Sequence, residues 1–502
     1  MMCVKMLEIY NTLKRDKELF VSENNSKRIS LFVCGPTVYD DAHIGHGRTY
    51  ISFDLIKSYL EFIGYSVFYL ENITDIDDKI INRAKEKNVY YKSLARFYEK
   101  RFKKDMELLN VNSINLYPRA TEHMDKIFDQ IEGLINKGFA YETEDGIYFE
   151  VAKFPDFGKL SNQNLDKLNS HRIDVSSTKK DSKDFALWKK TNKKPYFKSK
   201  WGNGRPGWHI EDTAITDEYF GPQYDIHGGG LDLIFPHHEA EIAQMESFSG
   251  KKPLVKYWMH SGFLNVDGIK MSKSLGNFIT IRKLLEDWDP MVFRLFVLST
   301  HYRSPIDFSE KSLIQPSKNL KRLKFTVENL TEFKNQLKEL KNNTYPNSGD
   351  GDNLDISGCL KEDIDFELLK RLAKVEEEFF KNMNDDFNTS RALAVILNFT
   401  KVINNFVDDK KILLNGIEKI PYEELKIPFE FACRSLKFLK EFERIFKLNL
   451  FVKDIESDNN LSENLLDILL DTRSKLREEK NYELSDYIRD QINELDIEIE
   501  DD

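Results

Sequence analysis

Two short segments carry side chains suited to phosphate chemistry. The first, His43-Ile44-Gly45-His46, sets two imidazoles around a glycine, and the second, Lys270-Met271-Ser272-Lys273-Ser274, sets two ammonium groups on one short stretch. Imidazole N–H groups can stabilise the charge that builds on a five-coordinate phosphorus, and lysines can neutralise the oxygens of a departing pyrophosphate. Together the segments predict chemistry at the α-phosphate of ATP, with four catalytic side chains: His43, His46, Lys270 and Lys273.

The surrounding pattern predicts the elements that position these segments. An apolar run over 29–33 is followed by the turn Gly35-Pro36 and then by helical periodicity from 49 to 62. We therefore expect a strand, a loop and a helix, with the first segment at the helix N-terminus, where backbone N–H groups and the helix dipole attract phosphates. Gly45 would let a nucleotide approach the backbone closely. Glycines at 268 and 276 predict that the second segment is a mobile loop that closes over the β- and γ-phosphates.

The composition is that of a folded protein with a well-solvated surface. Of 502 residues, 40% are hydrophobic, 12% aromatic and 31% charged, and the length suffices for three or more domains. No segment approaches the about 18 uninterrupted apolar residues of a membrane span, and Lys5 and Glu8 interrupt any signal-like start, so we expect a cytoplasmic protein without membrane contact. A formal charge of −10 argues against sequence-independent coating of nucleic acid but permits a local basic face.

The cysteines exclude two kinds of site. Cys3, Cys34, Cys359 and Cys433 are scattered without CxxC spacing. Neither a disulfide framework nor a four-cysteine zinc site is consistent with that spacing.

Changes in the pattern predict where the chain divides. Apolar strands at 29–33 and 65–70 and a later glycine-rich turn indicate a nucleotide-binding α/β fold that an insertion interrupts near Tyr117. An amphipathic helix over 121–138, short strands near 141 and 147–151, and a lysine-rich stretch would form the insertion. After Lys311, long charged periodic segments predict an antiparallel helical bundle.

Longer segments add a family resemblance. The two opening segments resemble the signature motifs of class I aminoacyl-tRNA synthetases, and further segments are similar to those of cysteinyl-tRNA synthetases over nearly the whole chain. These segments are Phe32 to Asp40, Asn72 to Lys79, Pro206 to Glu211, Asp225 to Gly230, Phe235 to Glu239 and Asn384 to Thr389.

The resemblance implies a fold class and a domain plan. It implies an α/β protein with a Rossmann-like class I catalytic domain and a connective insertion, followed by an α-helical bundle and a small C-terminal anticodon-binding unit. The expected boundaries are 1–117 and 206–263 for the catalytic halves, 118–205 for the insertion, 264–311 for the stem-contact region with the lysine loop, 312–450 for the tRNA-binding bundle and 451–502 for the anticodon-recognition unit.

The same resemblance implies substrate-binding residues. Positions similar to the family's ATP site are Gly35, Thr37, Gly45, His227, Gly228, Gly229, Gly230 and Lys273, and the three consecutive glycines would let adenosine lie against the backbone. Positions similar to its amino-acid pocket are Thr74, Trp208 and Asp232, the last of which would hold the substrate ammonium.

A metal site is also implied, with one departure. The family holds Zn²⁺ with two cysteines, a histidine and a glutamate, which correspond here to Cys34, Asp212, His237 and Glu241. Asp212 stands where the family has cysteine, but a carboxylate is a competent zinc ligand, so one ion per chain in a harder, more oxygen-rich site is expected. Zn²⁺ binds a thiolate strongly and a hydroxyl poorly, which would separate cysteine from serine, whereas shape alone discriminates by about 1–3 kcal/mol.

Two alternatives to this ligand set stay open. Zinc could be lost, leaving Cys34 as a buried residue at a strand end. If Asp212 points away from the ion, then His209, Glu211 or His238 lies close enough along the chain to replace it.

The implied reaction is a pair of successive transfers. The cysteine carboxylate attacks the α-phosphate of ATP, pyrophosphate leaves with Mg²⁺ and the lysine loop, and the adenylate passes its acyl group to the terminal ribose of cysteine tRNA. A basic and aromatic cluster in the otherwise acidic tail, formed by Arg473, Lys475, Arg477, Lys480, Tyr482 and Arg489, is expected to contact that tRNA. ATP, L-cysteine and cysteine tRNA are thus the expected partners of a monomer.

Two rival functions remain. A ligase that joins activated cysteine to an amino sugar would share the catalytic motifs but lack an anticodon-binding end. A catalytically silent paralogue that binds tRNA or nucleotide would lose its motifs, and the intact histidine and lysine segments argue against it.

Overall fold

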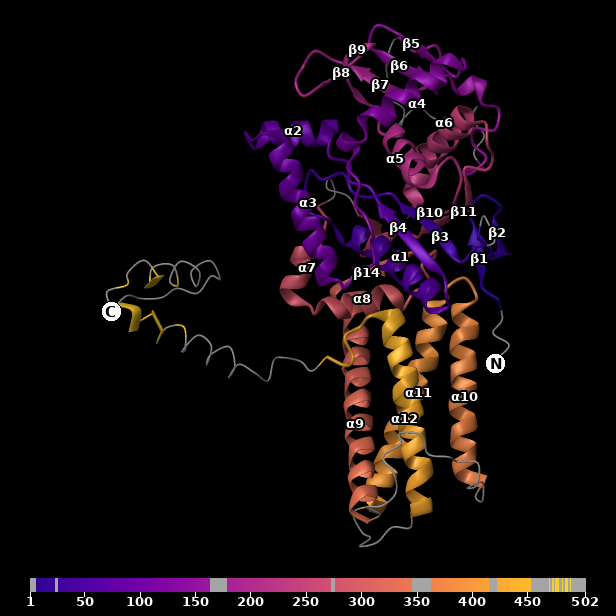
Figure 1. The fold of residues 1–502 in the computed structure, drawn as a ribbon, viewed down its shortest axis with the longest axis vertical. Helices are drawn as coiled ribbons and strands as arrows, with labels where there is room; N and C mark the ends of the chain where they lie inside the picture. The colour runs from indigo at the N-terminus through magenta and orange to yellow at the C-terminus, as the bar shows by residue number, and fades with distance from the viewer. Residues whose placement is uncertain are drawn as a thin grey trace. The chain divides into compact units, whose positions relative to one another are not determined.

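The structure is a computed structural model of the 502-residue chain. It describes residues 6–22, 26–162, 178–271, 276–344, 363–414 and 422–452, with a few positions between 469 and 488. The chain forms two compact units, Met1–Leu450 and Phe451–Asp502. Elements of the first unit are shown in Figure 1.

A parallel sheet of four strands, in the order β11-β10-β3-β4, forms the centre of the first unit (Figure 1). Its strands are β3 (Arg28–Val33), β4 (Ser66–Glu71), β10 (Tyr224–Gly230) and β11 (Val255–Ser261). The chain leaves β3 toward β4 on one side and returns as β10 on the other side. The loops after β3 and β10 therefore diverge, and ligands of open α/β sheets bind in such a crevice.

Helix α1 (Ile44–Phe62) follows β3 and contacts β4, β10 and β11. It is buried around most of its circumference, with even Arg48 and Asp54 inaccessible, so it has no solvent face. Helices α2 (Asp78–Glu86) and α3 (Tyr91–Leu108) then form a pair beside the sheet. Because α1 follows β3 directly, the N-terminus of α1 lies at the carboxyl end of the parallel sheet.

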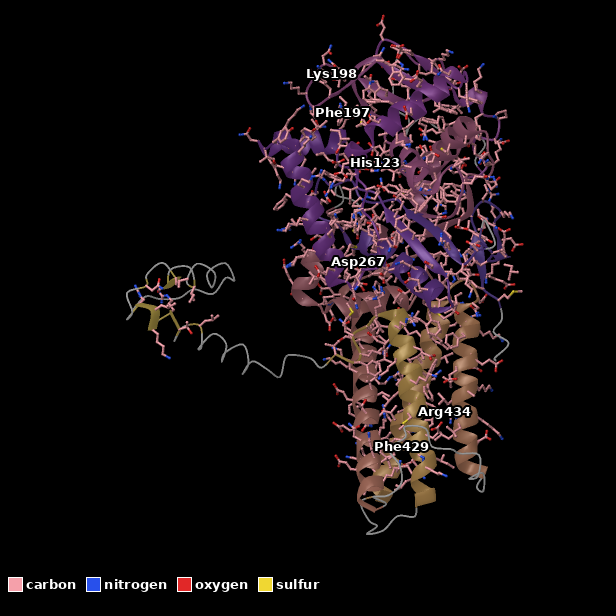
Figure 2. The ribbon with its side chains drawn as sticks, viewed as in Figure 1. His123, Phe197, Lys198, Asp267, Phe429 and Arg434 are labelled. Atoms are coloured by element: carbon pink, nitrogen blue, oxygen red, sulfur yellow. The ribbon has the colours of Figure 1, made fainter. Side chains whose placement is uncertain are left out.

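The insertion contains α4 (Met124–Asn136) and a five-stranded antiparallel sheet in the order β5-β6-β7-β9-β8. The strands are β5 (Ala140–Glu142), β6 (Gly146–Phe149), β7 (Phe185–Lys190), β8 (Phe197–Ser199) and β9 (Gly202–Pro206). Phe197 and Lys198 of β8, and His123 at the start of α4, are labelled in Figure 2. Helices α5 (Ile210–Phe220) and α6 (Glu239–Ser249) share one apolar core with this sheet and with β3.

A small sheet, β13-β12-β14, carries the chain toward the lysine segment. Its strands are β12 (Leu264–Val266), β13 (Ile269–Lys270) and β14 (Ile306–Phe308), with Asp267 (Figure 2) at the turn between the first two. Helices α7 (Ile281–Asp287) and α8 (Pro290–Leu298) follow, and the hairpin β1 (Glu8–Asn11) and β2 (Asp16–Leu19) flanks β11.

Four helices form the bundle: α9 (Ile314–Thr344), α10 (Asp363–Met383), α11 (Thr389–Leu414) and α12 (Tyr422–Phe446). The bundle and the antiparallel sheet lie at opposite ends of the first unit (Figure 1). Leu323, Leu330, Phe379, Ile403 and Phe442 are fully buried between the helices.

A buried ionic group joins the bundle to the catalytic part. Arg294 of α8 donates from Nη2 to Asp54 Oδ2 of α1 (2.6 Å) and from Nε to the carbonyl of Phe446 at the end of α12 (2.7 Å). Lys447 donates to Asp54 Oδ1 at 2.9 Å. These bonds compensate charges whose burial would otherwise be unfavourable, so the end of α12 is fixed against α1.

The predicted fold class is confirmed: a Rossmann-like parallel sheet, an insertion and a helical bundle are all present. The first helix begins at Ile44 rather than near 49, because His43 caps it. Within the described residues, no helix is both long enough and apolar enough to cross a membrane.

Candidate active site

A cleft of about 440 Å³ opens at the carboxyl ends of the parallel strands. The segments at the ends of β3, β10 and β11 contribute three parts of its lining, which are Cys34 to Thr37; Gly230, Asp232 and Leu233; and Gly262 and Phe263. His43, Gly45, His46, Lys270, Trp208 and Asp232 also line it. The structure thus brings residues of both opening motifs and of the expected amino-acid pocket into one cleft.

His43 and His46 form a reciprocal cap at the start of α1. His43 Nδ1 accepts from the backbone N–H of His46 (3.2 Å), and His46 Nδ1 accepts from that of His43 (3.3 Å). The two rings stack with centroids 3.7 Å apart. Because each Nδ1 accepts a backbone proton, the ring proton of each neutral imidazole must reside on Nε2. Both side chains therefore carry a donor while they hold the helix end.

Pairing of two distant segments brings the motifs together. Ile44 donates its N–H to the carbonyl of Ile279 (3.1 Å), and Ile281 donates to the carbonyl of Ala42 (2.9 Å), around a bridge between His43 and Thr280. The chain that follows the lysine segment is therefore fixed to the loop that precedes α1. Phe278 packs edge-on against the His43 ring with centroids 5.1 Å apart.

The structure describes Lys270 but not Lys273. Lys270 is exposed at the end of β13, and its Nζ lies 4.7 Å from the centroid of the Phe263 ring at the cleft. Residues 272–275, which include Lys273, lie outside the described residues. Met271 lines the cleft, and its methyl would lie 3.4 Å from a Cβ added to Gly45.

Close approach of two loops explains Gly35. A Cβ at this position would lie 1.6 Å from the carbonyl oxygen of Asn72, so only glycine fits there. The Gly35 N–H donates to Asn72 Oδ1 at 2.6 Å. The amide of Asn72 then donates from Nδ2 to Asp212 Oδ1 at 2.6 Å. The loop after β3 and the first turn of α5 are thus linked through one asparagine.

The expected amino-acid pocket is only partly exposed to the cleft. Trp208 is 40% exposed, and its ring stacks on His237 with centroids 4.1 Å apart. Asp232 is also exposed at the cleft. Thr74 is buried below it and donates from Oγ1 to Glu211 Oε2 at 3.1 Å. Thr74 therefore does not line the cleft itself.

The expected metal ligands meet in space. The donor atoms of Cys34, Asp212, His237 and Glu241 all lie within 4.8 Å of one another, and all four residues are buried. His237 Nε2 lies 3.0 Å from Asp212 Oδ2 and 3.2 Å from Glu241 Oε1. His237 lies in the π-helical turn Ile234–His238, which continues directly into α6, so its i, i+4 spacing from Glu241 brings the two side chains together.

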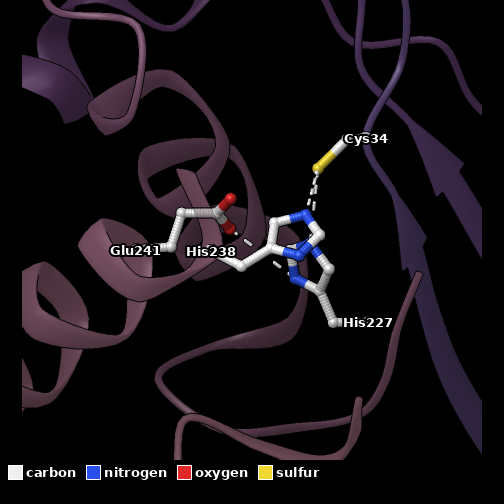
Figure 3. Close-up of side chains that lie close together, drawn as sticks. All are labelled: Cys34, His227, His238 and Glu241. Carbon is white, nitrogen blue, oxygen red and sulfur yellow. Dashed lines mark hydrogen bonds and ion pairs between the residues drawn. The ribbon is translucent and has the colours of Figure 1, made fainter. Parts of the chain in front are cut away.

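A second group of donors surrounds the same cysteine (Figure 3). Cys34 Sγ lies 3.4 Å from His227 Nε2 and 3.2 Å from His238 Nε2. His227 Nδ1 lies 3.6 Å from Glu241 Oε2. The donor atoms of Cys34, His227, His238 and Glu241 also fall within 4.8 Å of one another.

Burial sets the protonation of this region. Burial, with the charges of Glu241 and Asp212 nearby, raises the pKa of the Cys34 thiol well above its usual value. Burial and then Asp212 raise the pKa of Glu241. Burial likewise lowers the pKa of His227 and His238 well below the usual histidine value and that of His260 to about 3. The imidazoles are therefore neutral, as metal ligands must be.

One buried oxygen tests whether the residues fit a metal ion. Glu241 Oε1 is inaccessible and accepts no hydrogen bond from the described residues, although His237 Nε2 is 3.2 Å away. The proton on that nitrogen can serve only one of the carboxylates of Asp212 and Glu241 at a time. A divalent cation would satisfy both carboxylates and the thiolate together, so the donor set fits Zn²⁺.

The glycine-rich strand meets the cleft only at its end. Of the four residues expected to face adenosine, only Gly230 lines the cleft. His227 is fully buried and faces Cys34, while a Cβ on Gly228 would lie 2.4 Å from the Phe53 ring of α1. A Cβ on Gly229 would lie 2.9 Å from the His238 ring. Close packing against α1 and α6 already requires glycine at these two positions.

The expected tRNA contacts fall in the second unit. Lys480, Tyr482 and Arg489 lie outside the described residues. Arg473 is buried within its unit, whereas Lys475 and Arg477 are exposed. A buried guanidinium is not presented to an RNA phosphate, so of the two predicted arginines that the structure describes, Arg477 is the better placed.

Three residues of the site were not anticipated as site residues. Asn72 orients Asp212, and His260 Nε2 lies 2.9 Å from His238 Nδ1. Arg48 donates to the backbone carbonyls of Phe263, Tyr302 and Ser304, and so fixes the loop after β11. A polar residue inside an apolar strand or helix is a signal for such buried contacts, and it marks His260 and Arg48.

Comparisons with known proteins agree with this geometry. The family model "tRNA synthetases class I (C) catalytic domain" matches residues 20–318, and the "DALR domain" model matches residues 378–420. Proteins named cysteine–tRNA ligase are similar over nearly the whole chain: that of Methanococcus maripaludis is 44% identical over 500 residues, covering 99% of this chain and 97% of the relative. That of Thermoplasma volcanium is 44% identical over 496 residues, covering 98% and 97%.

A solved structure gives the same fold at low identity. Methionyl-tRNA synthetase of Mycobacterium tuberculosis, in complex with methionyl-adenylate, matches with a TM-score of 0.63 and 16% identity. The match covers 85% of this chain and 92% of that one.

Proposed function

The chain belongs to the cysteine-specific class I aminoacyl-tRNA synthetases, and we propose that it activates L-cysteine with ATP and transfers the cysteinyl group to cysteine tRNA. The observation that carries the proposal is the bridge between His43 and Thr280, which puts the histidine segment and the lysine segment on one cleft with Trp208 and Asp232.

The histidine pair would stabilise charge on the α-phosphate. The cap leaves Nε2 of His43 and of His46 as the nitrogens that bear protons, and both rings line the cleft. Two such donors at a helix N-terminus act most strongly where negative charge develops during attack by the cysteine carboxylate. Gly35, Thr37, Gly45 and Gly230 would border the nucleotide in this arrangement.

The lysine loop would serve the leaving group. Lys270 lies at the cleft, and Lys273 follows it by three residues. Two ammonium groups and Mg²⁺ bound to ATP would neutralise the pyrophosphate as it departs. The chemistry needs positioned charges and no protein nucleophile.

Selection of cysteine would depend on the buried donors. Cys34, Asp212, His237 and Glu241 would hold Zn²⁺ beside Trp208, and Asp232 would bind the substrate ammonium. When bound, zinc would favour a thiolate over a hydroxyl and so reject serine. Asn72 supports this role because it holds the Asp212 carboxylate toward His237.

The C-terminal part would recognise tRNA. The DALR match at 378–420 falls in the bundle, and the second unit carries the exposed cations Lys475 and Arg477. An amino-sugar ligase would have no use for such a region. Phosphate contacts from Arg477, with further contacts from Lys480, Tyr482 and Arg489, are part of this proposal.

Isotope exchange tests the proposal directly. Cysteine should drive exchange between pyrophosphate and ATP, serine should not, and added cysteine tRNA should then be charged. His46→Gln should lower the exchange rate by at least ~10²-fold, because it removes a donor used in the transition state. His123→Gln is the matched control, since His123 is a buried histidine that hydrogen-bonds to Arg119 away from the cleft. Cysteine-dependent exchange with no charging of tRNA would instead favour another acceptor.

A further inference from the structure

Cys34 and Glu241 lie between two groups of metal-binding side chains. On one side are Asp212 and His237, next to Trp208 and the cleft, and these form the outer set with Cys34 and Glu241. On the other side are His227 and His238, which form the inner set with the same two residues (Figure 3). Glu241 presents Oε1 toward His237 and Oε2 toward His227, so its two oxygens face different sets.

The inner distances match those of a tetrahedral ion. Zinc bonds of about 2.0 Å to nitrogen and about 2.3 Å to sulfur, at tetrahedral angles, separate the donor atoms by about 3.3–3.6 Å. The observed separations are 3.4 Å from Cys34 Sγ to His227 Nε2 and 3.2 Å from Cys34 Sγ to His238 Nε2. The thiol and the two imidazoles are therefore close to the spacing that a shared ion requires, and the donor atoms of all four residues lie within 4.8 Å of one another.

Second hydrogen bonds orient both inner imidazoles. His238 Nδ1 lies 2.9 Å from His260 Nε2, whose other nitrogen lies 2.8 Å from the Thr12 hydroxyl. His227 Nδ1 lies 2.7 Å from the hydroxyl of Tyr224. Partners on Nδ1 leave Nε2 of each ring facing the thiol, which is the arrangement that ligating histidines need.

When no substrate is bound, the charge and the chemical type of the ligands both favour Zn²⁺ at the inner set. The inner set contains a thiolate, a carboxylate and two neutral imidazoles, whose charges balance that of a divalent cation. The outer set carries a thiolate and two carboxylates, so with the same ion it keeps one excess negative charge in a buried place. A buried net charge is unfavourable, and nitrogen suits Zn²⁺ better than a second carboxylate oxygen does.

Position relative to the cleft also separates the two sets. In each set only Cys34 borders the cleft, and His227 and His238 are completely buried. Closed four-ligand sites are typical of structural zinc, whereas substrate-binding sites keep an open position. In the outer set His237 stacks on the partly exposed Trp208, which lines the cleft, so we assign the substrate thiol to this set.

We propose that Cys34, His227, His238 and Glu241 form a second, closed zinc position in this chain, which holds the ion when no cysteine is bound. The two positions share Cys34 and Glu241, and the single ion expected per chain would occupy either the inner or the outer position. The inference extends the metal role within the proposed function, but it is measured by metal binding rather than by ligation.

Metal titration of the full-length protein separates the two positions. Metal-free wild type and variants are titrated with Co²⁺, whose visible absorption reports a tetrahedral site with a thiolate ligand, and metal content is then measured after loading with Zn²⁺. Asp212→Ala, which leaves the inner set intact, should bind one Co²⁺ with an affinity within ~10-fold of wild type. His238→Gln without cysteine should lose at least ~10-fold in affinity, and the double variant should lose the Co²⁺ spectrum. His123→Gln serves as the control for a buried histidine outside the cluster.

The inference is wrong if Asp212→Ala binds no Co²⁺ or if His238→Gln binds Co²⁺ as tightly as wild type does. It is also wrong if the double variant keeps the Co²⁺ spectrum. Asp212→Asn, which keeps the shape of the side chain, replaces Asp212→Ala if the latter fails to fold by circular dichroism. Cysteine-dependent exchange by a protein that binds no metal would refute the inner position and leave the proposed function standing. Metal binding at the inner set without exchange would refute the proposed function alone.

Discussion

Asp386 accepts a hydrogen bond of 2.6 Å from Arg303 Nε, across the junction between the bundle and the catalytic part. Its other oxygen accepts from Tyr302 Oη and from the Tyr10 N–H, both at 2.9 Å. Arg48 of α1 holds the carbonyls of Tyr302 and Ser304 from the opposite side. The turn before α11 and helix α1 therefore fix the same loop, which leads into β14 beside β12.

This relationship predicts a difference between adjacent aspartates. Asp386→Asn should lower the free energy of unfolding by about 1–3 kcal/mol, because it leaves the partly buried Arg303 without its carboxylate partner. It should also slow exchange by on the order of 10-fold, because the loop that leads into β14 accepts a hydrogen bond from Gly262 of the cleft through the Tyr302 carbonyl. Asp385→Asn is the control, since Asp385 pairs with Lys17 at a partly exposed position, and it should cost less than about 1 kcal/mol. Thermal melts and exchange kinetics of the two variants provide the check, and equal effects would contradict the buried link.

The lysine loop gives a second prediction. Lys273→Ala should reduce the rate of adenylate formation on the order of 10²-fold, with nearly unchanged cysteine binding, because the lost charge acts mainly in the transition state. Lys283→Ala, at an exposed lysine paired with Glu286, should leave the rate unchanged. A near-normal single-turnover rate for Lys273→Ala would mean that this loop does not clamp the phosphates.

The division into two units predicts that activation and charging separate. A fragment ending at Leu450 contains the whole first unit and every residue of the cleft, so it should form cysteinyl-adenylate. It should charge cysteine tRNA poorly, because it lacks Arg477 and the rest of the second unit. Exchange and charging assays on the same preparation measure both properties, and full charging by the fragment would rule out a recognition role for residues 451–502.

Restoring the thiol at position 212 should tighten metal binding. Asp212→Cys replaces a carboxylate that is 3.0 Å from His237 Nε2 with a softer donor at the outer set. Competition with a chelator should show zinc affinity at least equal to that of the wild type, because thiolate suits Zn²⁺ better than carboxylate does. A clear fall in affinity would indicate that Asp212 is not directed at an ion.

Glu71 provides a prediction about pH. Burial raises the pKa of this carboxyl well above its usual value, although the hydroxyl of Tyr69 donates to it at 3.2 Å. The unfolded chain loses this proton near pH 4.3, whereas the folded chain keeps it to higher pH, so stability falls as pH rises between those values. Glu71→Gln removes the penalty and should melt at a higher temperature than wild type, with a gap that widens from pH 5 to pH 8.

The ionisation of Asp54 should make stability depend on pH in the opposite direction. Burial acts to raise its pKa, but Arg294 and Lys447 outweigh burial, and the pKa is lowered. Its ionised form therefore adds stability above about pH 4, and that stability is lost as pH falls through the folded pKa. Asp54→Asn should be destabilised at pH 7, and its gap from wild type should narrow toward acid.

The sequence by itself determined the local structural elements. Spacing of two histidines around Gly45 already specifies a helix N-terminus, because the capping bonds of His43 and His46 connect residues three apart. Apolar runs at 29–33 and 65–70 likewise specified buried parallel strands, since both faces of such strands are covered. The fold class and the nature of the chemistry followed from these local patterns and from the family resemblance.

Only the tertiary structure decided which distant residues meet. His227 was expected to border a nucleotide, but the register of β10 beside β3 turns its ring toward Cys34. Gly228 was expected to give access to adenosine, yet it makes room for Phe53 of α1. Such contacts depend on how strands and helices pack after the chain has folded, and side-chain type and spacing along the chain do not encode that packing. The same holds for Asp386 and Arg303, whose hydrogen bond exists only because the bundle returns to the loop after α8.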